Sequence, residues 1–271
     1  MRKFLFRCLL WLVLLFALEG LMYLTGFRFH TYNGVEVLHS IANSHKKTGK
    51  GTLILGDSVC KQLYPAERAY PDAVSLACNQ AITMAGHYFL MDNYFRENED
   101  CLPERIVFVC TPRCLQNNLD EFTYQYFLKP FLKKEYDSLF DDALQARIRQ
   151  IPYHWSAALP FIRVSNFAYA YQLPPEGSYA LVSPLAERYL KRMRDLAASK
   201  GIPFIILCAP LRESGRGAFE SLIEQAAAQK ELDEWLIQGF AGSVTYWPDS
   251  LFVDENHFEK DAVPEDPLHL L

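Results

Sequence analysis

The stretch TLILGDS, residues 52–58, gives the strongest indication of how this chain folds. Its first four residues form a short, continuous apolar run, as expected of a strand that is buried on both faces of a parallel sheet. The run ends in Gly56-Asp57-Ser58, and a short helix toward Leu63 is expected to follow. A strand that turns directly into a helix is typical of α/β proteins. The stretch therefore predicts the first strand of such a sheet, with Ser58 at its carboxyl end.

Strands and helices are expected to alternate along the rest of the chain. The expected strands cover 73–78, 105–110, 202–208 and 243–247, and the expected helices cover 84–97, 184–200 and 218–237. The helix over 184–200 is indicated clearly, because its apolar residues recur on one face. This alternation predicts an α/β fold with a doubly wound, five-stranded parallel sheet. In such sheets the functional residues gather at the carboxyl ends of the strands.

The region from Leu119 to about Tyr179 interrupts this alternation. It is rich in aromatic residues, contains no clear strand and is too long for a bare loop. We expect a helical insertion over about 119–180, lying over the strand ends as a satellite core or as a wall that binds a glycan or acyl group. The domain is expected over 51–271, after a linker and pre-domain segment over 27–50.

The N-terminus predicts a membrane anchor over residues 1–26. Arg2, Lys3 and Arg7 precede an apolar run that is long enough to span a bilayer if Glu19 is tolerated. No A-x-A-like site follows, which favours an uncleaved signal-anchor over a removed signal peptide or a buried helix. The positive charges would place the domain on the extracytoplasmic (periplasmic) side of the cytoplasmic, or inner, membrane, as a single-pass protein.

Composition excludes some classes of protein. The 271 residues are 50% hydrophobic, which argues against disorder. The net charge of -5 does not indicate the positively charged surface that nucleic-acid binding requires. Seven cysteines occur without a C-x-x-C pair, so neither a zinc site nor another metal or cofactor is expected. Cys78, Cys110 and Cys208 are expected in the core and Cys8 in the membrane. Pairing among Cys60, Cys101 and Cys114 stays open.

Three residues from the two ends of the domain suggest nucleophilic catalysis. A serine directly after a strand presents its hydroxyl at the edge of the sheet, and its N–H lies at a helix start, where it can hold an oxyanion. Such a serine needs an adjacent base. Asp254 and His257 are three residues apart, so on a helical turn the carboxylate could orient the imidazole toward Ser58. Asp57 is interpreted as a turn and helix-cap carboxylate.

These motifs resemble those of the SGNH (GDSL-like) hydrolases and acyltransferases. Gly56-Asp57-Ser58 is similar to the first block of that superfamily, and Asp254-x-x-His257 to the last. The resemblance implies a flavodoxin-like, three-layer fold with Ser58, His257 and Asp254 as catalytic residues. Residues 79–86 are similar to the second block, which makes Gly86 the implied second donor of the oxyanion hole, where a glycine lets the backbone approach the substrate.

The third block departs from the family pattern. The family has Gly-x-Asn-Asp after the third strand, whereas this chain has Thr-Pro-Arg there and two asparagines, Asn117 and Asn118, several residues later. Either asparagine is a candidate for the third oxyanion donor. Arg113 is a candidate to bind an anion or to form a surface ion pair.

The resemblance implies acyl transfer from an ester to water or to a sugar hydroxyl. The expected function is that of a serine-dependent acyl-ester hydrolase or O-acyltransferase acting on a cell-envelope polysaccharide or related acylated glycan. A partner protein of the envelope could supply the acyl group. The alternatives are a catalytically silent glycan-binding or assembly protein of the same fold, and a lipase-like esterase.

Overall fold

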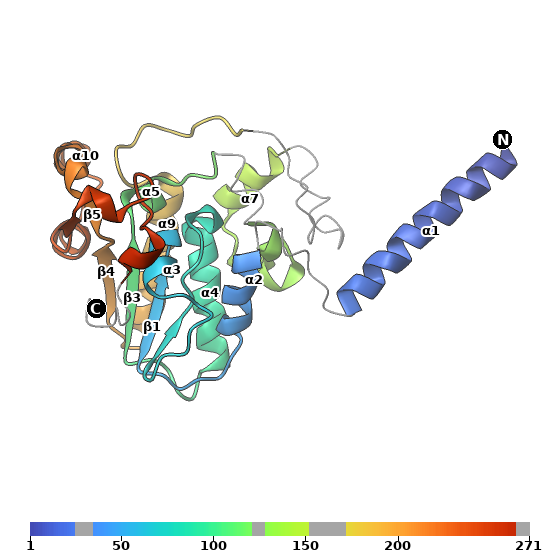
Figure 1. The fold of residues 1–271 in the computed structure, drawn as a ribbon, viewed down its shortest axis with the longest axis horizontal. Coiled ribbons are helices and arrows are strands. Elements are labelled where there is room, and N and C mark those ends of the chain that lie inside the picture. Colours follow the sequence, from blue (N-terminus) through green and yellow to red (C-terminus); the bar gives the residue numbers. More distant parts are fainter. Residues whose placement is uncertain (25–34, 121–127, 152–171, 264–271) are drawn as a thin grey trace.

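The computed structural model describes residues 1–24, 35–120, 128–151 and 172–263. A parallel sheet of four strands, in the order β2-β1-β3-β4, forms its centre (Figure 1). These strands are β1 (Thr52–Gly56), β2 (Ala73–Ser75), β3 (Arg105–Cys110) and β4 (Phe204–Cys208). The predicted α/β class with a parallel sheet is confirmed, and β1 lies where the sequence predicted the first strand.

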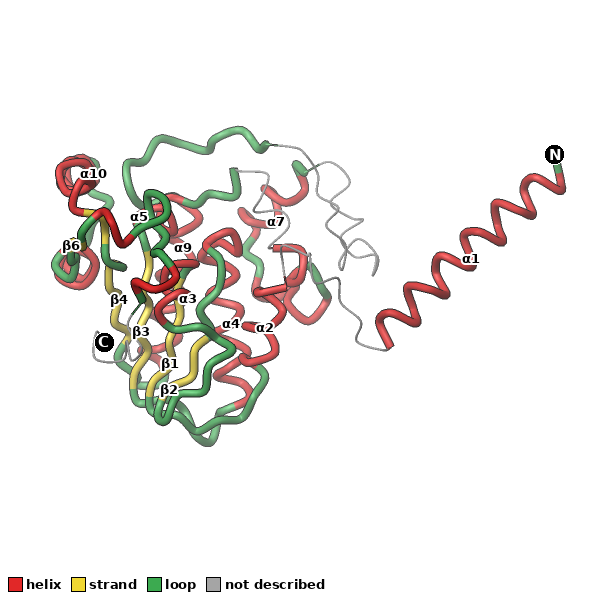
Figure 2. Tube along the Cα trace, in the orientation of Figure 1, coloured by secondary structure: helices red, strands yellow, loops and turns green. Residues whose placement is uncertain are grey.

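The α-helices other than α1 lie around this sheet (Figure 2). They are α1 (Arg2–Leu24), α2 (Val35–Ser44), α3 (Ser58–Leu63), α4 (Thr83–Glu97), α5 (Pro112–Gln116), α7 (Asp142–Arg149), α9 (Pro184–Ser199), α10 (Arg216–Ala228) and α11 (Glu234–Leu236). Short helical turns are η1 (Gln80–Ile82), η2 (Lys129–Phe131), η3 (Lys134–Leu139), η5 (Glu213–Gly215), η6 (Ile237–Ala241), η7 (Asp249–Leu251) and η8 (Lys260–Ala262). The helices predicted over 84–97 and 184–200 are confirmed as α4 and α9.

Alternate residues of the central strands face two different cores. Leu53 of β1 and Phe108 of β3 lie in the larger core, which buried residues of α2, α4 and α9 complete. Ile54 and Val107 lie in a smaller core, formed with α3 and with the segment that ends at Phe258. This two-residue alternation follows from the pleat of a strand, and it explains why the apolar run of β1 is continuous.

Helix α1 stands apart from the sheet in Figure 1. Its large apolar side chains from Phe4 to Leu18 are exposed. Among the described residues, however, no helix has the length and apolar character needed to cross a membrane. The prediction of a transmembrane helix over residues 1–26 is therefore unsupported.

The segment over 27–50 was predicted to be a linker and pre-domain segment, and its second half contains helix α2. Helix α2 buries Val37 and Ile41 in the larger core. Its Ser40 also donates a hydrogen bond of 3.0 Å to the carbonyl of Ala77, just after β2. The apolar positions of α2 are four residues apart, as expected of a helix with one buried face. The domain therefore begins before β1.

The fifth strand of the sheet was also predicted wrongly. Only Tyr246–Trp247 forms a strand, β6, and it pairs with β5 (Leu211–Arg212) in a separate two-stranded sheet. The outer edge of β4 is instead occupied by η6 and by Ser243, whose hydroxyl accepts a hydrogen bond of 2.8 Å from the Cys208 N–H. A serine side chain thus satisfies a backbone donor that a neighbouring strand would otherwise take.

The described part of the predicted insertion packs as a satellite of the larger core. Phe131, Tyr136 and Phe140 surround the buried ring of Phe89 on α4, with ring centroids 5.5, 5.7 and 4.8 Å away. Aromatic rings at these distances stabilise one another beyond the burial of their area. Residues 121–127 and 152–171 of the insertion lie outside the described residues.

Candidate active site

The turn from β1 into α3 brings Ser58 to the carboxyl edge of the sheet. Gly56 adopts a φ of +153° there, and a Cβ at this position would lie 1.9 Å from the carbonyl oxygen of Val109 and 2.5 Å from the Cβ of Cys60. A backbone atom of β3 cannot move aside without breaking the strand pairing. Glycine is therefore required, because it alone combines this backbone conformation with so close an approach.

We expect Gly56→Ala to prevent the domain from folding stably. Overpacking and an unfavourable backbone conformation together cost several kcal/mol, roughly 3 or more, which is a large part of a typical folding free energy. The measurement is urea unfolding followed by circular dichroism. Gly217→Ala is the matched control, because a Cβ on that residue of α10 would meet no atom within 4 Å. Equal stability of the two variants would contradict the role given to Gly56.

Asp57 ties the serine turn to the end of β3. Its Oδ1 accepts hydrogen bonds from the N–H groups of Val59 (3.0 Å) and Cys60 (3.2 Å), and its Oδ2 accepts from the N–H and hydroxyl of Thr111, both at 2.7 Å. The carboxyl group is fully buried. Burial raises the pKa of Asp57, and the hydrogen bonds from Thr111, Cys60 and Val59 oppose that rise. The predicted role of Asp57 as a helix cap is confirmed.

We expect Asp57→Asn to destabilise the protein by about 2–4 kcal/mol, because an amide nitrogen would face at least two of the four donors and leave them buried without an acceptor. Thr111→Val is the graded control, since it removes only the hydroxyl donor and is expected to cost about 1 kcal/mol. Thermal unfolding of both variants measures the difference. An Asp57→Asn variant as stable as Thr111→Val would contradict this assignment.

Ser58, His257 and Asp254 form one hydrogen-bonded chain. The Ser58 Oγ lies 2.8 Å from His257 Nε2, and His257 Nδ1 lies 2.8 Å from Asp254 Oδ2. Ser58 is half-buried, whereas 38% of the His257 side chain and 54% of the Asp254 side chain are exposed. The three residues predicted from opposite ends of the domain are thus brought together, with each ring nitrogen of His257 facing a different partner.

The backbone around Asp254 holds its carboxylate in the charged form. Oδ1 accepts hydrogen bonds of 2.8 Å from the N–H groups of Asn256 and His257, while Oδ2 faces the imidazole. Partial burial acts to raise the pKa of Asp254, but these hydrogen bonds outweigh it and lower the pKa to about 2. A carboxylate of this kind can fix the tautomer of the histidine so that Nε2 accepts the serine proton.

Gln62 positions the histidine loop, and the sequence did not point to it. Its Nε2 donates to the Phe258 carbonyl at 3.0 Å, and its Oε1 accepts from the Phe258 N–H at 2.9 Å. Gln62 lies four residues after Ser58 on α3, so one short helix carries both the candidate nucleophile and the side chain that binds the residue after His257. An isolated glutamine carries no sequence signal of such a role, because its partner lies 196 residues away.

The Ser58 N–H is the clearest donor for an oxyanion. The next two N–H groups of α3 are bound by the Asp57 carboxylate, and the Lys61 N–H by the Asp57 carbonyl. No described residue accepts a hydrogen bond from the Ser58 N–H. It therefore remains available to a charge that develops on a substrate beside the serine.

Gly86, the implied second oxyanion donor, lies within helix α4. It occupies the fourth position of α4, where a helical N–H is directed at the carbonyl four residues back. A Cβ on Gly86 would lie 2.6 Å from the Cβ of Ile82, so this glycine serves close packing within the helix start. The structure therefore does not support Gly86 as an oxyanion donor.

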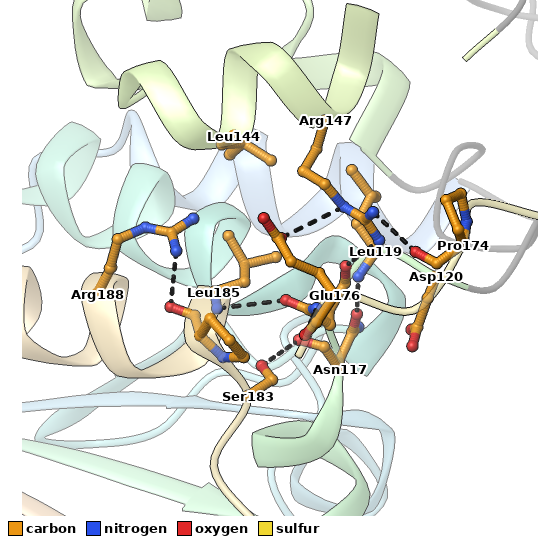
Figure 3. A network of polar contacts seen from close by, with 12 residues as sticks. Asn117, Leu119, Asp120, Leu144, Arg147, Pro174, Glu176, Ser183, Leu185 and Arg188 are labelled. Carbon is orange, nitrogen blue, oxygen red and sulfur yellow. Dashed lines mark hydrogen bonds and ion pairs between the residues drawn. The ribbon is translucent and has the colours of Figure 1, made fainter. Parts of the chain in front are cut away.

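The two candidate asparagines are buried and make structural hydrogen bonds, and Figure 3 shows Asn117 among its neighbours. The Asn117 amide donates to the Gln80 carbonyl at 2.6 Å, and its Oδ1 accepts from the Leu119 N–H at 3.0 Å. The Asn118 Oδ1 accepts from the Leu185 N–H at 3.3 Å. These bonds join the end of α5 to η1 and to α9, so neither asparagine is placed as the third oxyanion donor.

The cysteines and possible metal ligands add no further chemistry to this site. All seven cysteines are free, so no disulfide links Cys60, Cys101 or Cys114. Cys60, Cys78, Cys110, Cys114 and Cys208 are buried. Within the described ranges, no group of three or more His, Cys, Asp or Glu residues could hold a metal ion.

Comparisons of the chain with protein-family models, with curated proteins and with solved structures find no match. The geometry of the site is therefore what indicates a function.

Proposed function

We propose that this protein is a serine-dependent acyl-ester hydrolase or O-acyltransferase of the SGNH kind. The observation that carries the proposal is the hydrogen-bonded chain from Ser58 through His257 to Asp254, with both links at 2.8 Å. Serine becomes a useful nucleophile when a base that is itself oriented by a third group can take its proton. Ser58 and His257 are separated by 199 residues in the sequence, which makes an accidental arrangement a poor explanation.

The geometry supports a mechanism with two half-reactions. His257 Nε2 accepts the Ser58 hydroxyl proton while Oγ attacks the ester carbonyl, and the Ser58 N–H donates to the resulting oxyanion. His257 then returns the proton to the leaving alkoxide, which releases the alcohol and leaves an acyl-serine. Water, or a hydroxyl group of an acceptor, attacks this acyl-serine with His257 again as base. Asp254 keeps the imidazole oriented and stabilises its charged form throughout.

The arrangement of the sheet also supports this assignment. A doubly wound, flavodoxin-like domain carries its functional site at the carboxyl ends of its parallel strands. Ser58 follows β1 at that edge, and Thr111, which binds Asp57, follows β3. Helices α4 and α9 cover one face, while α3 and the C-terminal segment cover the other.

A second function is a catalytically silent domain that binds an acylated ligand. The unfilled part of the oxyanion hole favours it, because neither Gly86 nor the two asparagines are placed as donors. Loss of an oxyanion donor costs roughly 100- to 1,000-fold in kcat, so a site with one donor would be slow.

Labelling with a fluorophosphonate probe distinguishes the two functions. The proposed enzyme is expected to react through Ser58 and to lose the label in Ser58→Ala, whereas a silent domain would not react. Label that persists in Ser58→Ala would show that another residue reacts, and would reject Ser58 as the nucleophile. The length of acyl chain accepted, tested with p-nitrophenyl esters, then separates a short-chain esterase from a lipase-like one.

A further inference from the structure

A cavity of about 760 Å³ lies beside the candidate triad and has no part in the mechanism described above. Its walls come from α5, from β5 and α10, from the segment around Tyr179, and from the loop that carries Asp254 and His257. The volume falls within the range of sites that take up small organic ligands, which is roughly 300–1,000 Å³.

Two residues of the lining are next in sequence to residues of the site. Asn256 precedes His257, and Pro112 follows Thr111, which binds Asp57. Neither Ser58 nor His257 is itself part of the lining. A substrate whose ester lay at Ser58 would therefore place the rest of its structure, and not the ester, in this cavity.

The side chains of the wall indicate which kind of group fits. The lining contains two arginines, Arg113 and Arg212, and two carboxylates, those of Asp120 and Glu255, so its formal charges sum to zero. Arg212 also forms an ion pair of 3.0 Å with Asp249, which lies outside the lining. An aliphatic acyl chain in this cavity would displace water from the four charged groups of the lining. It would offer them no hydrogen bonds in return, which is unfavourable. A polyanion would be repelled by the two carboxylates, even though the arginines attract it.

A neutral carbohydrate meets all of these conditions. Its hydroxyl groups both donate and accept hydrogen bonds, and planar amide, carboxylate and guanidinium groups present donors and acceptors to match. Gln116 and Asn256 add two amides to the wall, while Tyr179 and Phe219 add aromatic rings against which the C–H face of a sugar can pack. Leu211 and Leu222 complete the apolar part of the lining.

We propose that this cavity binds the neutral oligosaccharide portion of an acylated glycan whose ester is presented to Ser58. The proposal rests on the proposed acyl-transfer function for its substrate, but the binding of sugar in the cavity can be measured without turnover. Ala218 offers the means to test it, because this residue of α10 is exposed and yet lines the cavity. A tryptophan there would occupy part of the cavity, and because Ala218 is exposed the new side chain would not need to enter the core.

The test compares Ala218→Trp with Ala227→Trp, which places the same side chain on an exposed position of the same helix away from the cavity. Two measurements are made on the full chain. Calorimetry follows the binding of neutral oligosaccharides derived from xylan, cellulose and chitin. Kinetics compare partially O-acetylated forms of these oligosaccharides with p-nitrophenyl acetate, an ester too small to need the cavity.

We expect at least one of these oligosaccharides to bind the wild type and Ala227→Trp equally well. Ala218→Trp is expected to weaken that binding by about tenfold or more, and to lower kcat/KM for the acetylated oligosaccharide far more than for p-nitrophenyl acetate. The ratio of the two losses is the diagnostic quantity, because general damage to the fold would lower both alike.

Three outcomes would overturn the proposal. The first is that none of the oligosaccharides binds, and the second is that Ala218→Trp and Ala227→Trp bind them equally well. The third is that Ala218→Trp selectively impairs esters of longer acyl chains, which would make the cavity an acyl pocket. Oligosaccharide binding that Ala218→Trp weakens, in a protein with no esterase activity, would instead keep the cavity assignment and reject the catalytic function.

Discussion

Replacing Ser58 by alanine is expected to lower kcat for ester hydrolysis by roughly 10⁶-fold, to the level left by binding and the oxyanion donor alone. The loss is large because the substitution removes the atom that forms the acyl-enzyme, and His257 then has no nucleophile to activate. Ser58 is half-buried at the first position of α3, so the thermal unfolding temperature should change little. Stopped-flow and steady-state assays with p-nitrophenyl acetate measure both the acylation burst and the turnover.

Ser221→Ala is the control for this prediction, because Ser221 is an exposed serine of α10 that takes no part in the site. It should retain wild-type kinetics. A Ser58→Ala protein that still shows an acylation burst would reject the proposed mechanism.

Replacing Asp254 by asparagine is expected to lower kcat by about 10⁴-fold with little change in KM, as for the equivalent change in other serine triads. The amide would present an N–H to His257 and favour the tautomer in which Nε2 carries the proton, so His257 could no longer accept the serine proton. Asp261→Asn, an exposed carboxylate in the same C-terminal segment, should leave kcat unchanged. An Asp254→Asn variant within tenfold of the wild type would remove Asp254 from the site.

The same carboxylate sets an expectation for pH. Because the pKa of Asp254 is about 2 in the fold, below its ordinary value of 3.8, its stabilising contribution is present at higher pH and is lost as the pH falls through about 2. Asp254 therefore stays ionised throughout the range above about pH 4, and no change of activity in that range should arise from its own titration.

The strands could be predicted because each is an uninterrupted apolar run closed by a turn. The run over 52–55 and the one over 105–110 both became strands of the sheet, and their residues divide between two cores. The prediction failed where tertiary contacts decided the outcome. Ser243 uses its side chain to occupy the edge of β4, so the chain around it cannot continue the sheet. Helix α2 was missed because it is short and its buried positions are few.

The triad could be predicted because serine, aspartate and histidine are chemically distinctive at these spacings. The residues that position the triad belong to no such recognisable sequence pattern. Gln62 acts through the backbone of Phe258, and Thr111 acts through the buried Asp57, so both contacts depend on the fold. The implied role of Gly86 is likewise not supported by the fold, because Gly86 lies at the fourth position of α4, in close contact with Ile82.

The distance along the chain between Ser58 and His257 has a consequence during protein synthesis. Ser58 and the turn that holds it are made 199 residues before the histidine. At about 5–20 residues per second, the ribosome needs roughly 10–40 s to bridge that interval. During that interval the growing polypeptide contains Ser58 but not its base. Ser58 is then as unreactive as any other serine. Catalytic competence would thus be conferred late, when Phe258 meets Gln62, so a prematurely terminated product that lacks this segment would be unable to attack the esters around it.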